Sequence, residues 1–271
     1  MQLDPFINFS FLKKQYRYKS LKKKFAIVTG GAGRIGSVFS SIFLINDCEV
    51  LILSRDESKF LEFKKNIPAK YKNKISWKKL DLTDPKTIED CVKVNSKIDF
   101  LVNNAANHYR GENFNYDYKN IKDEFFGLLG STILITEKIL KKMRNQKSGN
   151  IINVASIWGL SAPKFKTYLE MNIAPSLMTS ACKAGILHMT KYLASREAKY
   201  NITVNALSPG WFPRKGKKKR LDYINMINKD IPINRIGVLG DLIPAINFLI
   251  DEKNKYFTGQ SINIDGGHSV W

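Results

Sequence analysis

The sequence predicts an α/β fold, a doubly wound parallel sheet of about seven strands with helices on both faces. Short apolar runs alternate with amphipathic stretches from residue 24 onward, and the first apolar run leads straight into a glycine-rich turn. The 271 residues and their 44% hydrophobic content suit one large domain. We expect residues 1–20 to form an N-terminal extension and residues 21–271 to form that single domain.

The apolar runs predict seven strands, each followed by polar or turn-forming residues. They lie at Phe25–Thr29, Glu49–Leu53, Ile75–Leu80, Phe100–Asn103, Asn150–Ala155, Thr203–Leu207 and Ser261–Ile264. Between them, apolar residues recur at helical spacing. The expected helices are Ile35–Ile45, Ser58–Asn66, Pro85–Val94, Phe125–Arg144, Ser180–Tyr200 and Leu239–Ile250. Strands that alternate with helices in this way are typical of a parallel sheet.

The formal net charge of +20 is the most unusual global property of the chain. Such a charge can favour nucleic acid, anionic lipid or a phosphate-bearing substrate. The basic residues are spread along the sequence, and the two short runs at 22–24 and 217–220 are expected to be solvated surface. We therefore expect a small-molecule substrate and regard nucleic acid as an unlikely partner.

No stretch reaches the roughly 18 apolar residues that a membrane span requires, and the N-terminal residues carry scattered charges. We expect a cytoplasmic protein that does not contact a membrane. The three cysteines lack C-x-x-C spacing and the three histidines lack ligand-like neighbours, which predicts reduced thiols and no metal site. These residues are Cys48, Cys91, Cys182, His108, His188 and His268.

The turn after the first strand has the sequence Thr29-Gly30-Gly31-Ala32-Gly33-Arg34-Ile35-Gly36. Glycines in this order, between a strand and a helix, let main-chain amides approach a pyrophosphate without obstruction by Cβ atoms. A tight structural turn is the alternative. The order of strand, turn and helix favours a Rossmann dinucleotide site, with the cofactor-binding residues Gly30, Gly33, Arg34, Ile35 and Gly36.

The end of the second strand bears on the choice of dinucleotide. It reads Leu53-Ser54-Arg55, where a site specific for NAD typically places an acidic side chain on the ribose 2′-hydroxyl. Arg55 can instead pair with a 2′-phosphate, and Arg34 can assist. NADP(H) is therefore preferred over NAD(H) as the expected cofactor, unless Arg55 is only a surface charge.

Further segments, together with the glycine turn, resemble the short-chain dehydrogenase/reductase family over nearly the whole chain after residue 20. The resemblance implies that the substrate-facing serine is Ser156 in Asn153-Val154-Ala155-Ser156 and that the catalytic lysine is Lys183, which also binds the cofactor. It implies further cofactor contacts by residues of Leu80-Asp81-Leu82-Thr83, Asn103-Asn104-Ala105-Ala106 and Ser208-Pro209-Gly210, namely Asp81, Leu82, Asn103, Ala105, Pro209 and Gly210.

The segment from Ser156 to Gly159, with Ala162-Pro163-Lys164-Phe165 and Tyr168, is similar to bacterial members of that family associated with flagellin and surface-sugar modification. The family usually forms dimers or tetramers through its central helices and C-terminal region. The resemblance thus implies a homo-oligomer and a polar, nucleotide-sugar type of substrate. The basic stretch 211–230 follows a strand end and is expected to cover the substrate.

Two positions depart from the family pattern. The family tyrosine that exchanges a proton stands four residues before the lysine, and here that position is Thr179. An aliphatic hydroxyl is much less acidic than a phenol, whose pKa starts near 10. The asparagine of the family's N-L-x-G element, which supports a proton-relay water, is replaced by Gly127. Only Ser156 and Lys183 remain of the four residues.

Three functions stay open. The first is an active NAD(P)-dependent oxidoreductase on a carbonyl or hydroxyl group, with Thr179, Tyr168, Tyr109, water or the substrate itself supplying the proton. The second is a dinucleotide-binding scaffold or partner subunit without turnover. The third is an internal redox cycle with no net oxidation. A lost acid can cost only about 10²–10⁴ in rate, so the substitutions do not exclude an enzyme.

Overall fold

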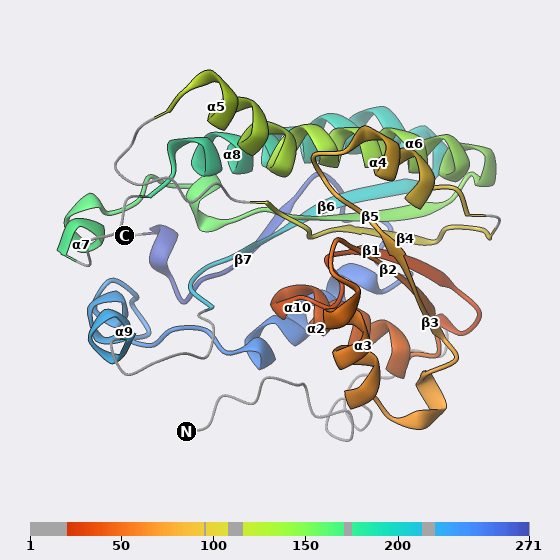
Figure 1. The fold of residues 1–271 in the computed structure, drawn as a ribbon, viewed down its shortest axis with the longest axis horizontal. Helices are drawn as coiled ribbons and strands as arrows, with labels where there is room; N and C mark the ends of the chain where they lie inside the picture. The colour runs from red at the N-terminus through yellow and green to blue at the C-terminus, as the bar shows by residue number, and fades with distance from the viewer. Residues whose placement is uncertain (1–20, 95, 108–115, 171–174, 213–219, 271) are drawn as a thin grey trace.

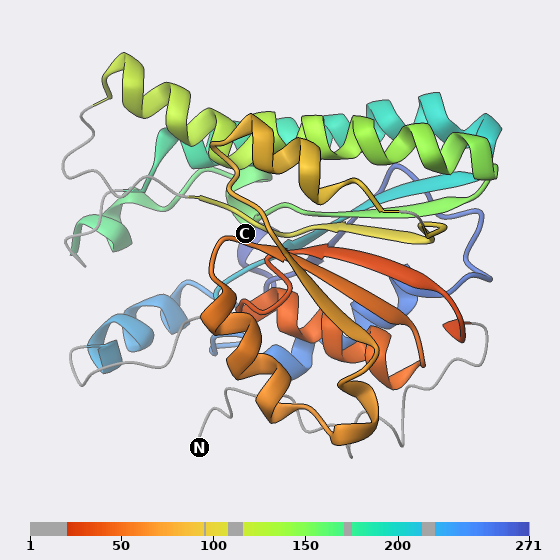
Figure 2. The ribbon, with the colours of Figure 1, turned by 45° about the vertical axis from the view of Figure 1, so that its right-hand side comes forward.

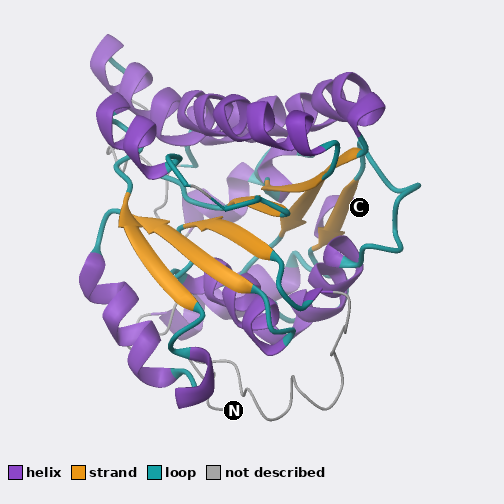
Figure 3. Ribbon diagram, turned by 90° about the vertical axis from the view of Figure 1, so that its right-hand side faces the viewer, coloured by secondary structure: helices purple, strands orange, loops and turns teal. Residues whose placement is uncertain are grey.

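The computed structural model describes residues 21–94, 96–107, 116–170, 175–212 and 220–270. Their strands form one seven-stranded parallel sheet in the order β3-β2-β1-β4-β5-β6-β7. Helices cover both faces of this sheet (Figure 1, Figure 3). The predicted doubly wound α/β fold is confirmed. The expected extension of residues 1–20 lies outside the described residues.

The strands begin and end within two residues of the expected positions. They are β1 (Phe25–Thr29), β2 (Glu49–Ser54), β3 (Ile75–Lys79), β4 (Phe100–Asn103), β5 (Gly149–Val154), β6 (Ile202–Pro209) and β7 (Ser261–Ile264). β6 extends past its expected end because Ser208 and Pro209 pair in register with β7. The strand order reverses between β1 and β4, so the carboxyl ends of these two strands flank the crevice where open α/β sheets bind ligands.

Two layers of helices enclose the sheet. One layer holds α2 (Arg34–Ile45), α3 (Glu57–Asn66) and α10 (Ile243–Ile250), and the other holds α4 (Pro85–Cys91), α5 (Tyr118–Phe125), α6 (Ser131–Gln146) and α8 (Leu177–Glu197) (Figure 1, Figure 2). The short helix α7 (Phe165–Glu170) follows β5, and α9 (Arg220–Lys229) follows β6. Short 3₁₀ segments lie at Ala69–Tyr71, Ile157–Gly159, Ala198–Tyr200, Leu239–Leu242 and His268–Val270.

Helix capping explains why two helices begin earlier than the apolar spacing predicts. The Asp117 side chain accepts a hydrogen bond from the Asn120 amide and starts α5, which continues through a π-helical turn, η3 (Phe126–Gly130), into α6. The Ser176 hydroxyl accepts from the Thr179 amide and starts α8. A side-chain acceptor at the N-cap satisfies an amide that the helix itself leaves unpaired. The first turns of both helices are therefore well defined.

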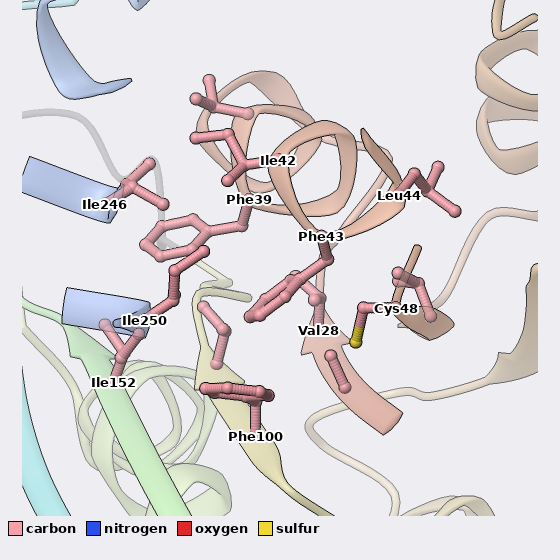
Figure 4. Close-up of a cluster of buried hydrophobic side chains, with 14 of the residues drawn as sticks. Val28, Phe39, Ile42, Phe43, Leu44, Cys48, Phe100, Ile152, Ile246 and Ile250 are labelled. Atoms are coloured by element: carbon pink, nitrogen blue, oxygen red, sulfur yellow. The ribbon is translucent and has the colours of Figure 1, made fainter. Parts of the chain in front are cut away.

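The core between α2 and the sheet fixes the start of α2 against the end of β1. Phe43 points from α2 toward Phe100 of β4, and Phe39 lies beside Ile246 and Ile250 of α10 (Figure 4). The rings of Phe43 and Phe100 have centroids 5.0 Å apart. These side chains are fully or almost fully buried, and each large apolar side chain removed from water stabilises the fold by about 1.5–3 kcal/mol. The glycine turn between β1 and α2 is thereby held rigidly.

Candidate active site

The glycine turn after β1 has a backbone geometry that requires glycine. Gly30 has a φ of +63°, in the left-handed region that side chains disfavour. The Gly33 amide donates to the Gly30 carbonyl oxygen at 2.8 Å. A Cβ at position 36 would lie only 2.2 Å from that same oxygen. The turn and α2 therefore approach one another more closely than any side chain at position 36 allows.

The N-terminus of α2 suits an anion. Gly33 precedes the helix, no side chain caps it within the described part of the chain, and its first turn holds no acidic residue. The first amides of a helix, here including those of Ile35 and Gly36, have no acceptor within the helix and carry the positive end of its dipole. Arg34 adds an exposed guanidinium group beside them. This uncapped cradle fits a pyrophosphate group.

Thr29 and Asn104 hold the turn in place, a role that the sequence patterns did not indicate. Thr29 Oγ1 accepts from the amides of Asn104 and Ala105, each at 2.9 Å, and donates to the Val102 carbonyl. Asn104 Nδ2 donates to the carbonyl oxygens of Thr29 and Gly30. The ends of β1 and β4 are thus bonded together across the crevice. Ala105 lies against Gly30, at the position expected for a cofactor contact.

Arg55 and Asp81 lie near one another at the ends of β2 and β3. Arg55 is exposed, and Asp81 accepts from the amide and the hydroxyl of Thr83. The Thr83 hydrogen bonds hold the pKa of Asp81 below its ordinary value, and the charge of Arg55 lowers it further. Asp56, the acid nearest to the end of β2, caps α3 by accepting from the Ser58 and Lys59 amides. The positive group at this strand end is therefore Arg55.

Leu82 and Ile35 pack in the hydrophobic clusters on the two opposite faces of the sheet. Leu82 is buried in the cluster below α4, and the half-buried Ile35 contacts the core around α2. Gly210 donates its amide to the Ile264 carbonyl at 2.9 Å, and a Cβ there would meet Asp265 at 2.8 Å. Pro209 ends β6 directly before it. These residues shape the walls of the crevice.

The side chain of Asn103 takes part in a buried network below the site. Its Nδ2 donates to Thr136 Oγ1 and Asn153 Oδ1, both at 2.8 Å. Asn153 Nδ2 in turn donates to Thr190 Oγ1 at 2.9 Å. The network ties β4 and β5 to α6 and α8. The side-chain amide nitrogen of Asn103 is therefore engaged within the protein.

Ser156 and Lys183 converge at the end of β5. The half-buried Ser156 caps the 3₁₀ turn Ile157–Gly159 by accepting from the Trp158 amide. Lys183 Nζ donates to the carbonyl oxygen of Val154 at 2.7 Å, and burial lowers the pKa of this lysine to about 8. A Cβ on Gly159 would lie 2.6 Å from the Lys183 carbonyl carbon. This close approach brings the strand end that carries Ser156 against α8.

Thr179, which the sequence motifs place at the family's tyrosine position, has a partner that the sequence patterns missed. Its side chain is 4% exposed, and its hydroxyl donates to Glu124 Oε1 at 2.7 Å. Ser176 Oγ donates to the same oxygen at 2.7 Å. Glu124 stands at an apolar position of α5 and is 1% exposed. Glu124 lies just before the predicted helix Phe125–Arg144, and the apolar spacing gave no signal for it because α5 begins earlier than that helix.

Gly127 lies in the π-helical turn between α5 and α6. Its carbonyl oxygen accepts from the Asn107 amide at 2.9 Å, and a Cβ at position 127 would lie 2.8 Å from the Asn107 carbonyl oxygen. Turns of π-helix are rare and often occur at functional sites. The close approach of the segment after β4 thus explains why residue 127 is a glycine.

Tyr168 lies in an aromatic cluster. Its phenol oxygen accepts from Trp158 Nε1 at 3.0 Å, and its ring stacks on Trp211 with centroids 5.6 Å apart. Only 2% of Tyr168 is exposed, and burial raises the pKa of its phenol. A phenol in this state is a poor proton donor, so the geometry favours a packing role. Tyr109, the other candidate tyrosine, lies outside the described residues.

The stretch expected to cover the substrate is described only in part, since residues 213–219 lie outside the described residues. Its end forms α9, and Asp230 just after α9 accepts from Thr167 Oγ1 of α7 at 2.5 Å. The described residues contain no group of three or more His, Cys, Asp or Glu side chains placed to hold a metal ion. Within the same residues, no helix combines the length and the apolar character needed to cross a membrane.

A family model described as Enoyl-(Acyl carrier protein) reductase matches residues 31–269. The chain belongs to the short-chain dehydrogenase/reductase family. The match begins within the glycine turn, at residue 31, and includes Ser156, Lys183 and β7. The resemblance stated from the sequence motifs is confirmed.

Relatives of this short-chain dehydrogenase/reductase differ in their named activities. The Post-translational flagellin modification protein A of Campylobacter coli is 29% identical over 255 residues, which cover 91% of this chain and 98% of the relative. An acetoacetyl-CoA reductase of an Acinetobacter strain is 27% identical over 253 residues, with coverage of 91% and 98%.

Solved structures of similar short-chain dehydrogenase/reductase proteins hold both dinucleotides. A short chain dehydrogenase from Leptospira borgpetersenii with bound NAD⁺ matches with a TM-score of 0.80 at 27% identity, over 97% of this chain and 96% of that chain. ElxO with NADP bound matches with a TM-score of 0.77 at 28% identity, over 91% and 98%. These neighbours bind nicotinamide dinucleotides of both kinds.

Proposed function

We propose that this protein is an NADP(H)-preferring oxidoreductase that acts on a carbonyl or hydroxyl group of a polar substrate. The observation that carries the proposal is the uncapped glycine cradle at the N-terminus of α2, where a Cβ at position 36 would lie 2.2 Å from the Gly30 carbonyl oxygen. Such close packing with unpaired amides serves a bound pyrophosphate. The flagellin-modification relative supports a nucleotide-sugar type of substrate.

The chain's residues divide into cofactor-holding and substrate-holding groups. The amides of the glycine turn would hold the pyrophosphate, Arg55 the 2′-phosphate and Asp81 the adenine side. Lys183 would bind the ribose, and Ser156 would hydrogen-bond the reacting oxygen. The bound nicotinamide supplies or accepts the electron pair. Trp211 follows Gly210 at the end of β6 and helps to enclose the substrate side, because it stacks on the buried Tyr168.

Two assays test this function on the purified full-length chain. Fluorescence titration with NADPH and NADH measures binding, and absorbance at the nicotinamide band measures turnover on panels of carbonyl compounds and nucleotide sugars. We expect tight NADPH binding and turnover of at least one polar carbonyl compound. Binding without turnover on every panel would favour the scaffold function, and absence of binding would overturn the proposal.

Arg55 sets the preference for NADP(H). The Arg55→Ala variant is expected to bind NADPH at least about tenfold more weakly, because a hydrogen bond to a charged group contributes roughly 1.5–3 kcal/mol. NADH affinity should stay unchanged, since NADH lacks the 2′-phosphate. The matched control is Lys65→Ala, which removes a positive charge from the last turn of α3. Equal losses for both dinucleotides would contradict this role of Arg55.

The exposed apolar side chains of the central helices suit a homo-oligomer. Phe125, Phe126, Ile133 and Leu134 are exposed along α5, η3 and α6. Large apolar groups gathered on a helix face typically mark a protein interface. Leu134→Glu is expected to convert the oligomer to monomer in sedimentation velocity. Leu61→Glu, an exposed leucine on α3, is the control and should leave the sedimentation coefficient unchanged.

A further inference from the structure

Glu124 is a buried carboxyl group with an unsatisfied oxygen. Its Oε1 accepts from the hydroxyls of Ser176 and Thr179, each at 2.7 Å. Its Oε2 is buried and has no hydrogen-bond partner, and Glu124 takes part in no ion pair among the residues described. Buried polar atoms in folded proteins are nearly always paired, so an unpaired carboxyl oxygen needs a functional explanation. Glu124 Oε2 can therefore take up one proton or accept one hydrogen bond.

The hydroxyl bonded to Glu124 belongs to the site. Thr179 lies four residues before Lys183, one helical turn away on the same face of α8. Lys183 in turn reaches the Val154 carbonyl at the end of β5, two residues before Ser156. A threonine hydroxyl donates one hydrogen bond and accepts others at the same time. Thr179 can therefore accept from a substrate hydroxyl while it donates to the carboxyl group.

The carboxyl group also has a path toward solvent. Ser176 Oγ lies 3.4 Å from the phenol oxygen of Tyr116, which donates to it. Tyr116 is half-buried, and its oxygen accepts from the Leu177 amide at 2.7 Å. The hydroxyls of Ser176 and Tyr116 thus lead from Glu124 to the surface. Ser176 and Thr179 both donate to the same oxygen of Glu124, so the carboxyl group links the Thr179 hydroxyl to this path.

We propose that Glu124 holds the proton that the reacting oxygen exchanges, and that the Thr179 hydroxyl passes this proton between them. In oxidation, the alcohol O–H bond breaks and its proton goes to Thr179 Oγ1, while Thr179 gives its own proton to Glu124. The carbinol C–H bond breaks, its electron pair and hydrogen go to the oxidised nicotinamide, and the C=O bond forms. In reduction the same transfers run in reverse.

This proposal rests on the proposed oxidoreductase function. Glu124 acts through Thr179 and is therefore a positioning residue, whereas Thr179 touches the substrate oxygen. Together they take over the proton exchange that the family assigns to its tyrosine. Ser176 and Tyr116 take over the connection to solvent that the family asparagine supports.

Other titratable groups face this carboxyl group. On α8, burial raises the pKa of the Cys182 thiol to about 11, and the charge of Glu124 adds to the rise. Lys183 lies next to Cys182 on the same helix and loses its proton near pH 8. Tyr116 faces Glu124 through Ser176, and the neighbouring Asp123 on α5 is exposed. These are the titratable groups that face or neighbour the Glu124 carboxyl group, and among them Lys183 is expected to set the alkaline limb of the pH profile.

The test compares Glu124→Gln with the control Asp123→Asn, a neighbouring acid on the exposed face of α5. We expect Glu124→Gln to lower kcat/KM by about 100-fold or more, as for a lost general acid or base, and to change the shape of the pH profile of kcat/KM. NADPH affinity should be unchanged. Thr179→Val should cause a similar loss, and Thr179→Ser should recover a large part of it. Asp123→Asn should keep the wild-type profile.

A second measurement does not need turnover. Infrared difference spectra of the cofactor-free protein, wild type minus Glu124→Gln, are recorded between pH 5 and pH 9. We expect a carboxylic acid C=O band that is absent from the variant, because the proposal requires this carboxyl group to take up a proton. Thermal melting shows whether each variant is folded.

The two measurements separate the failure of this proposal from the failure of the proposed function. Wild-type protein that binds no nicotinamide dinucleotide, or never turns over, overturns the proposed function, and the infrared band then decides the role of Glu124. A folded Glu124→Gln variant with wild-type kcat/KM and an unchanged pH profile overturns the Glu124 proposal. The absence of the Glu124 carboxyl band overturns it as well.

Discussion

Gly36→Ala is expected to abolish detectable NADPH binding at micromolar protein concentrations. The new Cβ would lie 2.2 Å from the Gly30 carbonyl oxygen and 2.7 Å from Asn104 Nδ2, distances that force the turn and α2 apart. Crowding of this kind costs typically 1–3 kcal/mol and shifts the amides that would hold the pyrophosphate. Fluorescence titration with NADPH and thermal melting measure the two effects.

Gly240→Ala is the matched control, because a Cβ at position 240 meets nothing within 4 Å. It makes the same chemical change in the 3₁₀ segment before α10, away from the glycine turn. We expect its NADPH affinity and melting temperature to equal those of the wild type. A Gly36→Ala variant that binds NADPH as tightly as this control would show that the glycine turn does not hold the pyrophosphate. That result would also contradict the proposed function.

Lys183→Met is expected to lower kcat/KM by about 100-fold or more while the chain stays folded. The ammonium group lies beneath the expected ribose position, and its loss removes both a cofactor contact and the charge that favours proton exchange. Methionine has a similar length and tolerates a buried position. The steady-state rate on the substrate found in the carbonyl panel measures the loss. A variant with a wild-type rate would show that Lys183 has no part in the chemistry.

The difference in stability between the wild type and Lys183→Met is expected to depend on pH. Burial lowers the pKa of Lys183 to about 8 from 10.5, so between these pH values the unfolded chain holds a proton that the folded chain lacks. The contribution of Lys183 to the free energy of unfolding therefore rises with pH across this window. Below about pH 8, the buried ammonium group destabilises the folded chain to its full extent. We expect the wild-type melting temperature to rise relative to that of Lys183→Met between pH 8 and pH 10.5. A constant difference would contradict the lowered pKa.

Much of the fold could be predicted from the sequence because parallel strands buried on both faces are nearly continuous apolar runs. The β1 strand and the glycine turn were placed correctly, since Gly30 and Gly36 meet steric demands that only glycine satisfies. Helix starts were less predictable. Ser176 and Asp117 cap α8 and α5 through single side chains, and a periodic apolar pattern does not register them.

The sequence by itself determined the α/β order and the glycine turn between β1 and α2. These features depend on the spacing of residues that lie close together in the sequence. Only the tertiary structure decided that Tyr168 is buried against Trp158 and that Glu124 meets Thr179 across 55 residues. Contacts between distant segments depend on how α5 packs against α8, and short-range patterns contain no record of that packing.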